Sequence, residues 1–112
     1  MYYPPLNQVK EMASQGNLIP VYREINADLE TPVSAYLKIA RSPYSFLLES
    51  VEGGEHIARY SFIGTEPYKV IRTGKGHIDG EVDPLSLVQQ EMEKFRLVHI
   101  DGLPRFEGGA VG

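Results

Sequence analysis

Two apolar runs separated by a pair of glycines are the feature of this sequence that most restricts its fold. Residues 44–50 (Tyr-Ser-Phe-Leu-Leu-Glu-Ser) are rich in strand-forming side chains, and Gly53-Gly54 follows them. Residues 56–63 then place two sets of side chains on alternate sides, as a strand does. We therefore predict an antiparallel hairpin turned at the two glycines, and the unbroken apolar run predicts that its first strand is buried on both faces.

Two pairs of a capping residue and a proline predict helix starts. In Thr31-Pro32 the hydroxyl can accept a backbone N–H, while proline takes a position whose N–H has no partner in a helix. We expect this helix to end at Ser42-Pro43 and to share one face among Val33, Tyr36, Leu37 and Ala40. Asp83-Pro84 repeats the pattern, and an apolar stripe predicts a helix to about residue 94 or 95: Leu85, Val88, Met92 and Phe95.

Weaker patterns fill the remaining chain. A short helix is predicted from about residue 6 to 15, with Gly16-Asn17 as a left-handed end, and a strand over residues 18–25. Residues 68–73 and 77–79, separated by Gly74-Lys75-Gly76, predict a second hairpin. The predicted fold class is α+β, with an antiparallel sheet of four strands and flanking helices.

Composition excludes several classes of protein. The chain has 112 residues, which is one domain at most, and its formal net charge of −4 argues against a nucleic-acid partner. It has no cysteine, so no disulfide framework or thiolate site is expected. No apolar stretch approaches the roughly 18 residues of a membrane span, and the first residues lack the pattern of a secretory signal, so we expect a cytoplasmic protein without a membrane partner.

Catalytic and metal-binding patterns are weak, and we expect neither kind of residue in this stretch. The histidines at 56, 77 and 99 lack the spacing that places two imidazoles on one metal. Alternating acids at 79, 81 and 83 are better explained by a solvated turn and a helix cap. Gly74-Lys75-Gly76 lacks the helix-opening signature of a phosphate-binding loop, and a hairpin turn explains it better.

Glu49 and Ser50 stand out because a carboxylate and a hydroxyl end an apolar run. Burial of such groups is costly unless a partner satisfies them. One possible partner is the chain itself, through backbone N–H groups near residues 51–54 or through Arg59. The other is the ammonium group of a bound amino acid whose side chain lies on the apolar wall.

Four blocks in order then resemble the N-terminal region of anthranilate synthase component I: Leu-Ile-Pro-Val-Tyr-Arg-Glu at 18–24, Thr-Pro-Val-Ser-Ala-Tyr-Leu at 31–37, Phe-Leu-Leu-Glu-Ser-Val-Glu-Gly-Gly at 46–54, and Arg-Tyr-Ser-Phe-Ile-Gly at 59–64. The closing Leu-Pro-x-Phe-x-Gly-Gly-Ala-Val-Gly at 103–112 adds to the resemblance. It implies that residues 1–112 are the N-terminal part of a larger, β-sandwich-like chorismate-enzyme subunit. The glycine at 112, after an apolar pair, also suggests the front piece of a longer protein.

The resemblance implies a role in tryptophan biosynthesis. With a glutamine amidotransferase subunit as partner, such enzymes convert chorismate and glutamine, or ammonia, to anthranilate and pyruvate. Mg²⁺ and chorismate would be bound by a C-terminal domain that these residues do not include. We therefore expect the 112 residues to be inactive by themselves.

The resemblance also implies a regulatory site. The family's Leu-Leu-Glu-Ser element helps to bind L-tryptophan as a feedback inhibitor, which assigns inhibitor contacts to Leu48, Glu49 and Ser50, with Glu49 as the ammonium partner. Tyr60, on the expected return strand, is a further candidate. Two alternatives remain: aminodeoxychorismate synthase component I, a folate-pathway enzyme, and a stand-alone module that binds a small ligand.

Overall fold

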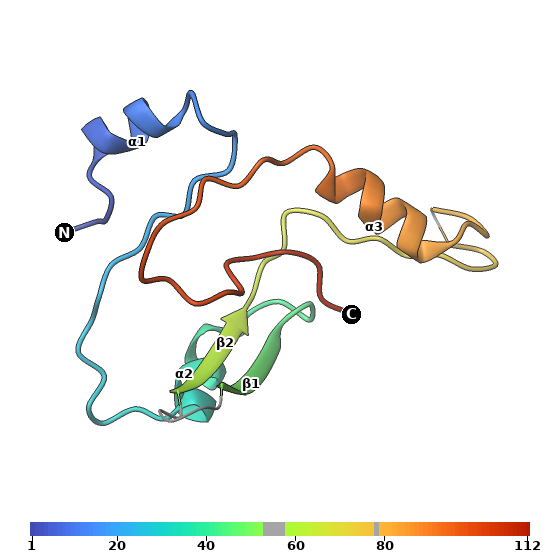
Figure 1. The fold of residues 1–112 in the computed structure, drawn as a ribbon. Helices are drawn as coiled ribbons and strands as arrows, with labels where there is room; N and C mark the ends of the chain where they lie inside the picture. The colour runs from blue at the N-terminus through green and yellow to red at the C-terminus, as the bar shows by residue number, and fades with distance from the viewer. Residues whose placement is uncertain (53–57, 78) are drawn as a thin grey trace. The chain divides into compact units, whose positions relative to one another are not determined.

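A computed structural model describes residues 1–52, 58–77 and 79–112 (Figure 1). Its elements, in chain order, are α1 (Leu6–Met12), α2 (Pro32–Ile39), β1 (Phe46–Glu52), β2 (Ala58–Gly64) and α3 (Pro84–Met92). They fall into two compact units. The first unit holds residues 1–25, 71–110 and 112, with α1 and α3, and the second holds residues 26–70 and 111, with α2 and the two strands. The predicted α+β class is confirmed.

The predicted hairpin is present in the second unit. Strands β1 and β2 pair antiparallel, with Phe46 opposite Gly64 and Ser50 opposite Tyr60. Strand β1 begins two residues later than predicted. The expected turn at Gly53-Gly54 and the predicted start of the return strand at residues 56–57 lie outside the described residues. At the open end, a Cβ on Gly64 would lie 2.2 Å from the Phe46 ring, so this position favours glycine.

The prediction that β1 is buried on both faces is wrong. Leu48 is 43% exposed and Glu49 is also exposed. The described residues give a sheet of two strands rather than four, and α2 is the helix that packs against both. One short helix cannot cover both faces of a hairpin, so apolar side chains of β1 remain in contact with solvent.

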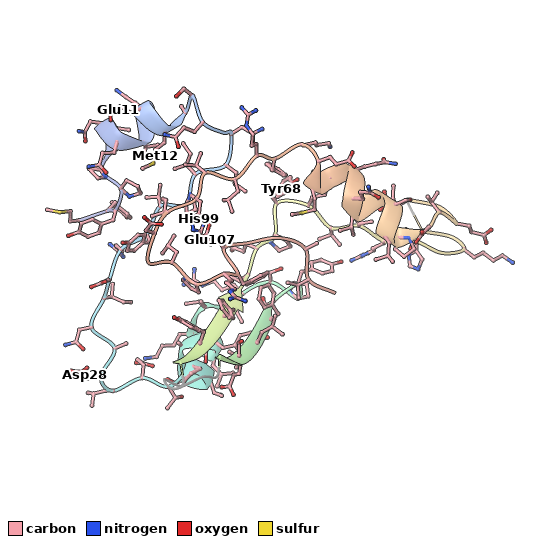
Figure 2. All side chains as sticks on the ribbon, in the orientation of Figure 1. Glu11, Met12, Asp28, Tyr68, His99 and Glu107 are labelled. Carbon is pink, nitrogen blue, oxygen red and sulfur yellow. The ribbon has the colours of Figure 1, made fainter. Side chains whose placement is uncertain are left out.

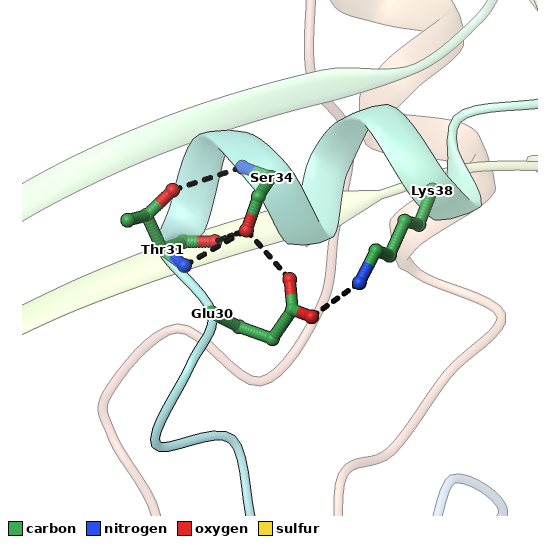
Figure 3. A network of polar contacts seen from close by, with 4 residues as sticks. All are labelled: Glu30, Thr31, Ser34 and Lys38. Atoms are coloured by element: carbon green, nitrogen blue, oxygen red, sulfur yellow. Dashed lines mark hydrogen bonds and ion pairs between the residues drawn. The ribbon is translucent and has the colours of Figure 1, made fainter.

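Helix α2 begins as predicted, at a reciprocal cap (Figure 3). Thr31 Oγ1 accepts the backbone N–H of Ser34 at 3.0 Å, and Ser34 Oγ accepts the backbone N–H of Thr31 at 2.8 Å. The Ser34 hydroxyl also donates to Glu30 Oε2 at 2.6 Å, and Lys38 pairs with the other Glu30 oxygen. On the predicted apolar face of this helix, Tyr36 and Ala40 are half-buried, whereas Val33 and Leu37 are exposed.

Helix α3, in the first unit, also begins as predicted. Asp83 Oδ1 accepts the backbone N–H of Leu85 at 3.0 Å, and Pro84 occupies the first turn. The helix ends at Met92, and a turn in which the Phe95 N–H donates to the Met92 carbonyl continues it to the predicted boundary. Val88 and Phe95 of the apolar stripe are half-buried, and Leu85 and Met92 are exposed.

Gly16 has a different role from the one predicted. Helix α1 ends at Met12 rather than residue 15, and the φ angle of Gly16 is not positive, so the left-handed helix end is wrong. A Cβ at this position would lie 2.3 Å from the Arg96 carbonyl oxygen. Glycine is required here because two backbone segments far apart in sequence touch.

These two segments are joined by hydrogen bonds on both sides of that contact. Leu18 and Leu97 form a parallel bridge, and the Val98 N–H donates to the Leu18 carbonyl at 2.9 Å. The Asn17 side chain donates to the Lys94 carbonyl at 2.7 Å and accepts the Arg96 N–H at 2.5 Å. Val98, 3% exposed, is the buried hydrophobic side chain among the described residues.

The strand predicted over residues 18–25 is reduced to isolated bridges. Besides the pairing of Leu18 with Leu97, Tyr22 pairs with Tyr3 through backbone hydrogen bonds of 2.7 and 2.8 Å. A continuous strand is wrong here, and Pro20 gives a physical reason, because proline has no N–H to contribute to a ladder.

The predicted second hairpin is a hydrogen-bonded turn instead. The Gly74 N–H donates to the Gly80 carbonyl at 2.7 Å, and the Arg72 N–H donates to Asp79 Oδ2 at 2.8 Å. Gly74 and Gly80 have φ angles of 116° and 68°, which residues other than glycine rarely adopt. Residues in the left-handed region turn the chain and do not continue an extended strand. Residue 78 lies outside the described chain.

Candidate functional site

Three of the four predicted inhibitor contacts lie on one face of the hairpin. Ser50 is directly opposite Tyr60, and Leu48 is directly opposite Phe62. Alternate residues of a strand point to the same side, and residues opposite each other share a face. Leu48, Ser50, Tyr60 and Phe62 therefore form one surface, which we call the aromatic face of the hairpin.

Glu49 lies on the other side of the hairpin, where it is opposite Ser61. A regular strand cannot direct the side chains of two consecutive residues to one side. The structure therefore brings Ser50, Leu48 and Tyr60 together and separates Glu49 from them. The carboxylate and the hydroxyl do not form the adjacent pair that their sequence positions suggest.

Neither polar group is engaged by the chain in the described structure. Within residues 1–52, 58–77 and 79–112, no side-chain hydrogen bond or ion pair is formed by Glu49 or by Ser50. Glu49 is exposed, so water satisfies its carboxylate, whereas Ser50 is half-buried. The hydroxyl of Ser50 is thus free to donate to and accept from a ligand.

Phe62 is the residue of the aromatic face that the sequence analysis did not select. Its ring stacks on that of Tyr60, with centroids 6.1 Å apart and planes inclined by 27°. The signal was present in the alternation of Arg-Tyr-Ser-Phe at 59–62, which places the two rings on the same side. Two rings, an exposed leucine and a hydroxyl together suit a ligand that has a planar apolar part and a polar end.

Two of the other acidic candidates considered from sequence have structural roles. Asp79 accepts a backbone N–H inside the turn at residues 72–80, and Asp83 caps α3. His56 lies outside the described residues. In the part of the chain that the structure describes, no three acidic, histidine or cysteine side chains gather into a group able to hold a metal ion.

No described helix has the length and apolar character needed to cross a membrane.

Comparison with known proteins gives a match over the whole chain. No family model and no solved structure matches. The chain is 43% identical over 122 residues to anthranilate synthase component 1 of Acetivibrio thermocellus, covering 100% of this chain and 25% of that protein. It is 46% identical over 123 residues to anthranilate synthase component 1 of Synechocystis, covering 100% of this chain and 24% of the relative. The resemblance to anthranilate synthase component 1 is confirmed.

A eukaryotic relative gives the same result. The chain is 45% identical over 113 residues to the probable anthranilate synthase component 1 of Schizosaccharomyces pombe, covering 98% of this chain and 22% of that protein. The chain thus spans about a quarter of the length of the anthranilate synthase component 1 proteins that it matches. Their names do not favour the folate-pathway alternative.

Proposed function

We propose that residues 1–112 are the N-terminal regulatory region of an anthranilate synthase component 1. The observation that supports this proposal is the similarity of the whole chain, at 43–46% identity, to proteins of that name. The complete cytoplasmic enzyme, with a glutamine amidotransferase subunit, converts chorismate and glutamine, or ammonia, to anthranilate and pyruvate for tryptophan biosynthesis.

The catalytic step belongs to the part of the enzyme outside these residues. Among the described side chains, no three acidic, histidine or cysteine residues gather into a group, and the proposal assigns no metal ligand to this region. Mg²⁺ and chorismate bind in the C-terminal domain in this proposal. The role of the present chain is to sense the end product.

The proposed inhibitor is L-tryptophan, bound on the aromatic face of the hairpin. The Ser50 hydroxyl hydrogen-bonds its polar end, while Leu48 and Tyr60 contact its ring. This assignment is supported by the shared face of the three residues and by the absence of a competing partner for Ser50 within the described chain. A stacked pair of rings is also a suitable wall for an indole.

Glu49 reaches the same ligand around the edge of β1. In the described sheet of two strands, β1 has one unpaired edge, which presents backbone donors and acceptors. An amino acid lying along this edge contacts side chains that project to both sides of the strand. The Glu49 carboxylate then pairs with the ammonium group, while Ser50 and the rings act from the aromatic face.

Inhibition follows if tryptophan binds more tightly to an arrangement of the enzyme with low activity. The ratio of the two affinities sets the degree of inhibition, and the coupling free energy of such systems is typically about 1–3 kcal/mol. A substitution that blocks the site should abolish inhibition without changing the uninhibited rate.

The first test is Ser50→Phe in the complete enzyme. The benzyl group fills the space beside Tyr60, so we expect inhibition by tryptophan to be lost while anthranilate formation without tryptophan stays close to that of the parent. The rate of anthranilate formation from chorismate, ammonia and Mg²⁺ is measured by fluorescence over a tryptophan titration. Ser14→Phe is the control, because it makes the same change at an exposed serine of the first unit, which holds none of the four proposed contacts. Superimposable inhibition curves for parent and Ser50→Phe contradict the site assignment.

The activity itself is tested by product analysis of the complete parent enzyme. Chorismate and ammonia should give anthranilate and pyruvate, and glutamine should replace ammonia only when the amidotransferase subunit is added. Formation of aminodeoxychorismate without pyruvate would instead support the folate-pathway alternative. If chorismate does not react at all, the result supports the alternative of a stand-alone module that binds a small ligand.

A further inference from the structure

Glu107 has a buried carboxylate for which the described chain offers no hydrogen-bond donor. Its side chain is only 5% exposed, and neither carboxylate oxygen has a hydrogen-bond partner. It lies in the first unit, in the closing segment at residues 103–109, where its neighbours Gly108 and Gly109 are exposed. The function proposed above makes no use of this carboxylate.

A carboxylate in this position is destabilising unless a positive charge compensates it. Transfer of an unpaired ionised group from water into a protein interior costs several kcal/mol, even after the protein relaxes. An oxygen without any donor also forgoes the charge-assisted hydrogen bonds that normally stabilise a buried acid. A cation close to Glu107 would offset this cost.

His99 is positioned to be that cation. Its Nδ1 atom lies 3.9 Å from Glu107 Oε1, slightly beyond hydrogen-bond distance, and the two side chains are seen together in Figure 2. The imidazole is 73% exposed, so it can turn toward the carboxylate and can exchange protons with water. No other basic nitrogen of the described residues lies within 4.0 Å of a Glu107 oxygen.

The remaining ionisable groups of the neighbouring segments do not replace His99. Arg105 and Asp101 lie on the same stretch of chain, Arg96 precedes the buried Val98, and the paired segment at residues 17–22 contributes Tyr22. All four side chains belong to exposed residues. None forms an ion pair with Glu107 in the described structure.

We propose that protonated His99 is the counter-ion of Glu107, and that this pair is a proton-dependent latch that holds residues 103–109 against the segment after α3. When His99 is protonated, a small rotation of its ring turns the 3.9 Å approach into a charge-assisted hydrogen bond. When it is neutral, the carboxylate loses the one cation that lies near it in the described part of the chain, and the segment is released. The latch is thus closed while His99 is protonated and Glu107 is ionised, and it opens when His99 loses its proton.

Hydrogen–deuterium exchange of the intact polypeptide tests the latch. Exchange of the amides at residues 103–109 is compared between variants at one pH at a time, about 5.5 and about 8.5, on either side of the usual range for histidine. At the lower pH, we expect His99→Gln and Glu107→Gln each to speed exchange about tenfold relative to the parent, the factor typical of a lost hydrogen bond between charged groups. At the higher pH, His99→Gln should match the parent.

His99→Lys sharpens the test, because lysine remains charged at both pH values. This variant should protect the segment at pH 8.5 better than the parent does, and combining it with Glu107→Gln should remove the gain. His77→Gln is the matched control, since it removes an exposed histidine elsewhere in the first unit. Equal exchange of the parent, His99→Gln and His99→Lys at both pH values overturns the proposal. The same conclusion follows if His99→Gln has an effect that does not depend on pH or on Glu107.

Discussion

The contacts inside the first unit differ in kind from the contacts inside the second unit. In the second unit, the elements that pair or pack are neighbours in sequence: α2 packs on the hairpin that follows it, and β1 pairs with β2. In the first unit, the closest contacts join Asn17 and Leu18 to residues 94–98, almost 80 positions later. The second unit is therefore organised by local signals, and the first by a backbone contact that only the folded chain creates.

This difference predicts at which positions of each unit a substitution most reduces stability. A change at a point where distant backbones touch has no flexible neighbour to absorb it, because main-chain atoms cannot adopt another rotamer. A change within a hairpin or a cap is met by side chains that can move, or removes one hydrogen bond. We therefore expect larger effects at the junction of the first unit than at comparable positions of the second.

Gly16→Ala should have the largest effect on stability. The new Cβ would lie 2.3 Å from the Arg96 carbonyl oxygen and 3.0 Å from the Val98 side chain, so the two segments must separate. We expect a loss of about 3 kcal/mol, the upper end of the range for overpacked sites. The measurement is the free energy of opening from hydrogen exchange of the Leu18 and Val98 amides.

Gly64→Ala is the matched substitution in the second unit. Its Cβ would lie 2.2 Å from an atom of the Phe46 ring, which can turn aside at the half-buried end of the hairpin. We expect a cost of about 1 kcal/mol. If the two alanine variants lose the same stability, the contrast between a backbone contact and a side-chain contact does not explain the two units.

Asn17→Ala should have the next largest effect. Its side chain makes two hydrogen bonds to main-chain groups near the end of α3, donating to the Lys94 carbonyl and accepting the Arg96 N–H. Loss of both should cost about 1.5 kcal/mol, because Asn17 is exposed and water replaces part of each bond. Asn17→Asp keeps the acceptor and loses the donor, so its amide exchange should fall between the parent and the alanine variant. An aspartate variant as weak as alanine would show that the bond to the Lys94 carbonyl accounts for the whole contribution of the Asn17 side chain.

Thr31→Ala tests a local signal of the second unit. It removes the oxygen that accepts the Ser34 N–H at the start of α2, and the usual cost of such a change is about 1 kcal/mol. Thr31→Ser keeps the hydroxyl and should retain most of the stability. Exchange of the α2 amides reports the loss, while the Leu18 and Val98 amides should be unaffected. A loss that spreads to the first unit would contradict the independence of the two sets of contacts.

The same contrast explains what could be predicted from the sequence. Thr31-Pro32 and Asp83-Pro84 gave correct helix starts because a cap depends on residues within one turn of each other. The hairpin was correct for a similar reason, since two strand-like runs are brought together by a short connection. Gly16 was misread because its requirement comes from Arg96, and no pattern around residue 16 contains that information.

In the candidate site, too, the sequence predicts individual residues better than it predicts how they are arranged. Ser50, Leu48 and Tyr60 were selected from sequence, and the register of the hairpin is what places them on one face. Glu49 was selected as the neighbour of Ser50, but neighbours in a strand point to opposite sides. The alternation at residues 59–62 already places Phe62 on the side of Tyr60, but its position directly opposite Leu48 follows only from the pairing of β1 with β2. Their roles in binding tryptophan remain predictions.

Glu30→Gln should have the smallest effect, and the size of this effect depends on pH. Hydrogen bonds from Lys38 and then Ser34 lower the pKa of Glu30 below its ordinary value of 4.5. A carboxyl whose pKa is lowered on folding adds stability above the unfolded pKa, and this contribution is lost as the pH falls through the folded pKa. The parent should therefore exceed Glu30→Gln in melting temperature at about pH 6, with the difference disappearing on acidification to well below 4.5.

Because the Glu30 carboxylate and the Lys38 ammonium lie at the surface, salt should reduce this difference as well. Glu24→Gln provides the control, since Glu24 is an exposed glutamate of the first unit. This variant removes a carboxylate that forms no ion pair in the described structure, so it controls for the loss of one surface charge. A Glu30→Gln variant that differs from the parent equally at both ends of the range would mean that the charge of Glu30 does not stabilise α2. The helix start would then depend on the reciprocal bonds of Thr31 and Ser34 alone, which are as local as the sequence signal that predicted them.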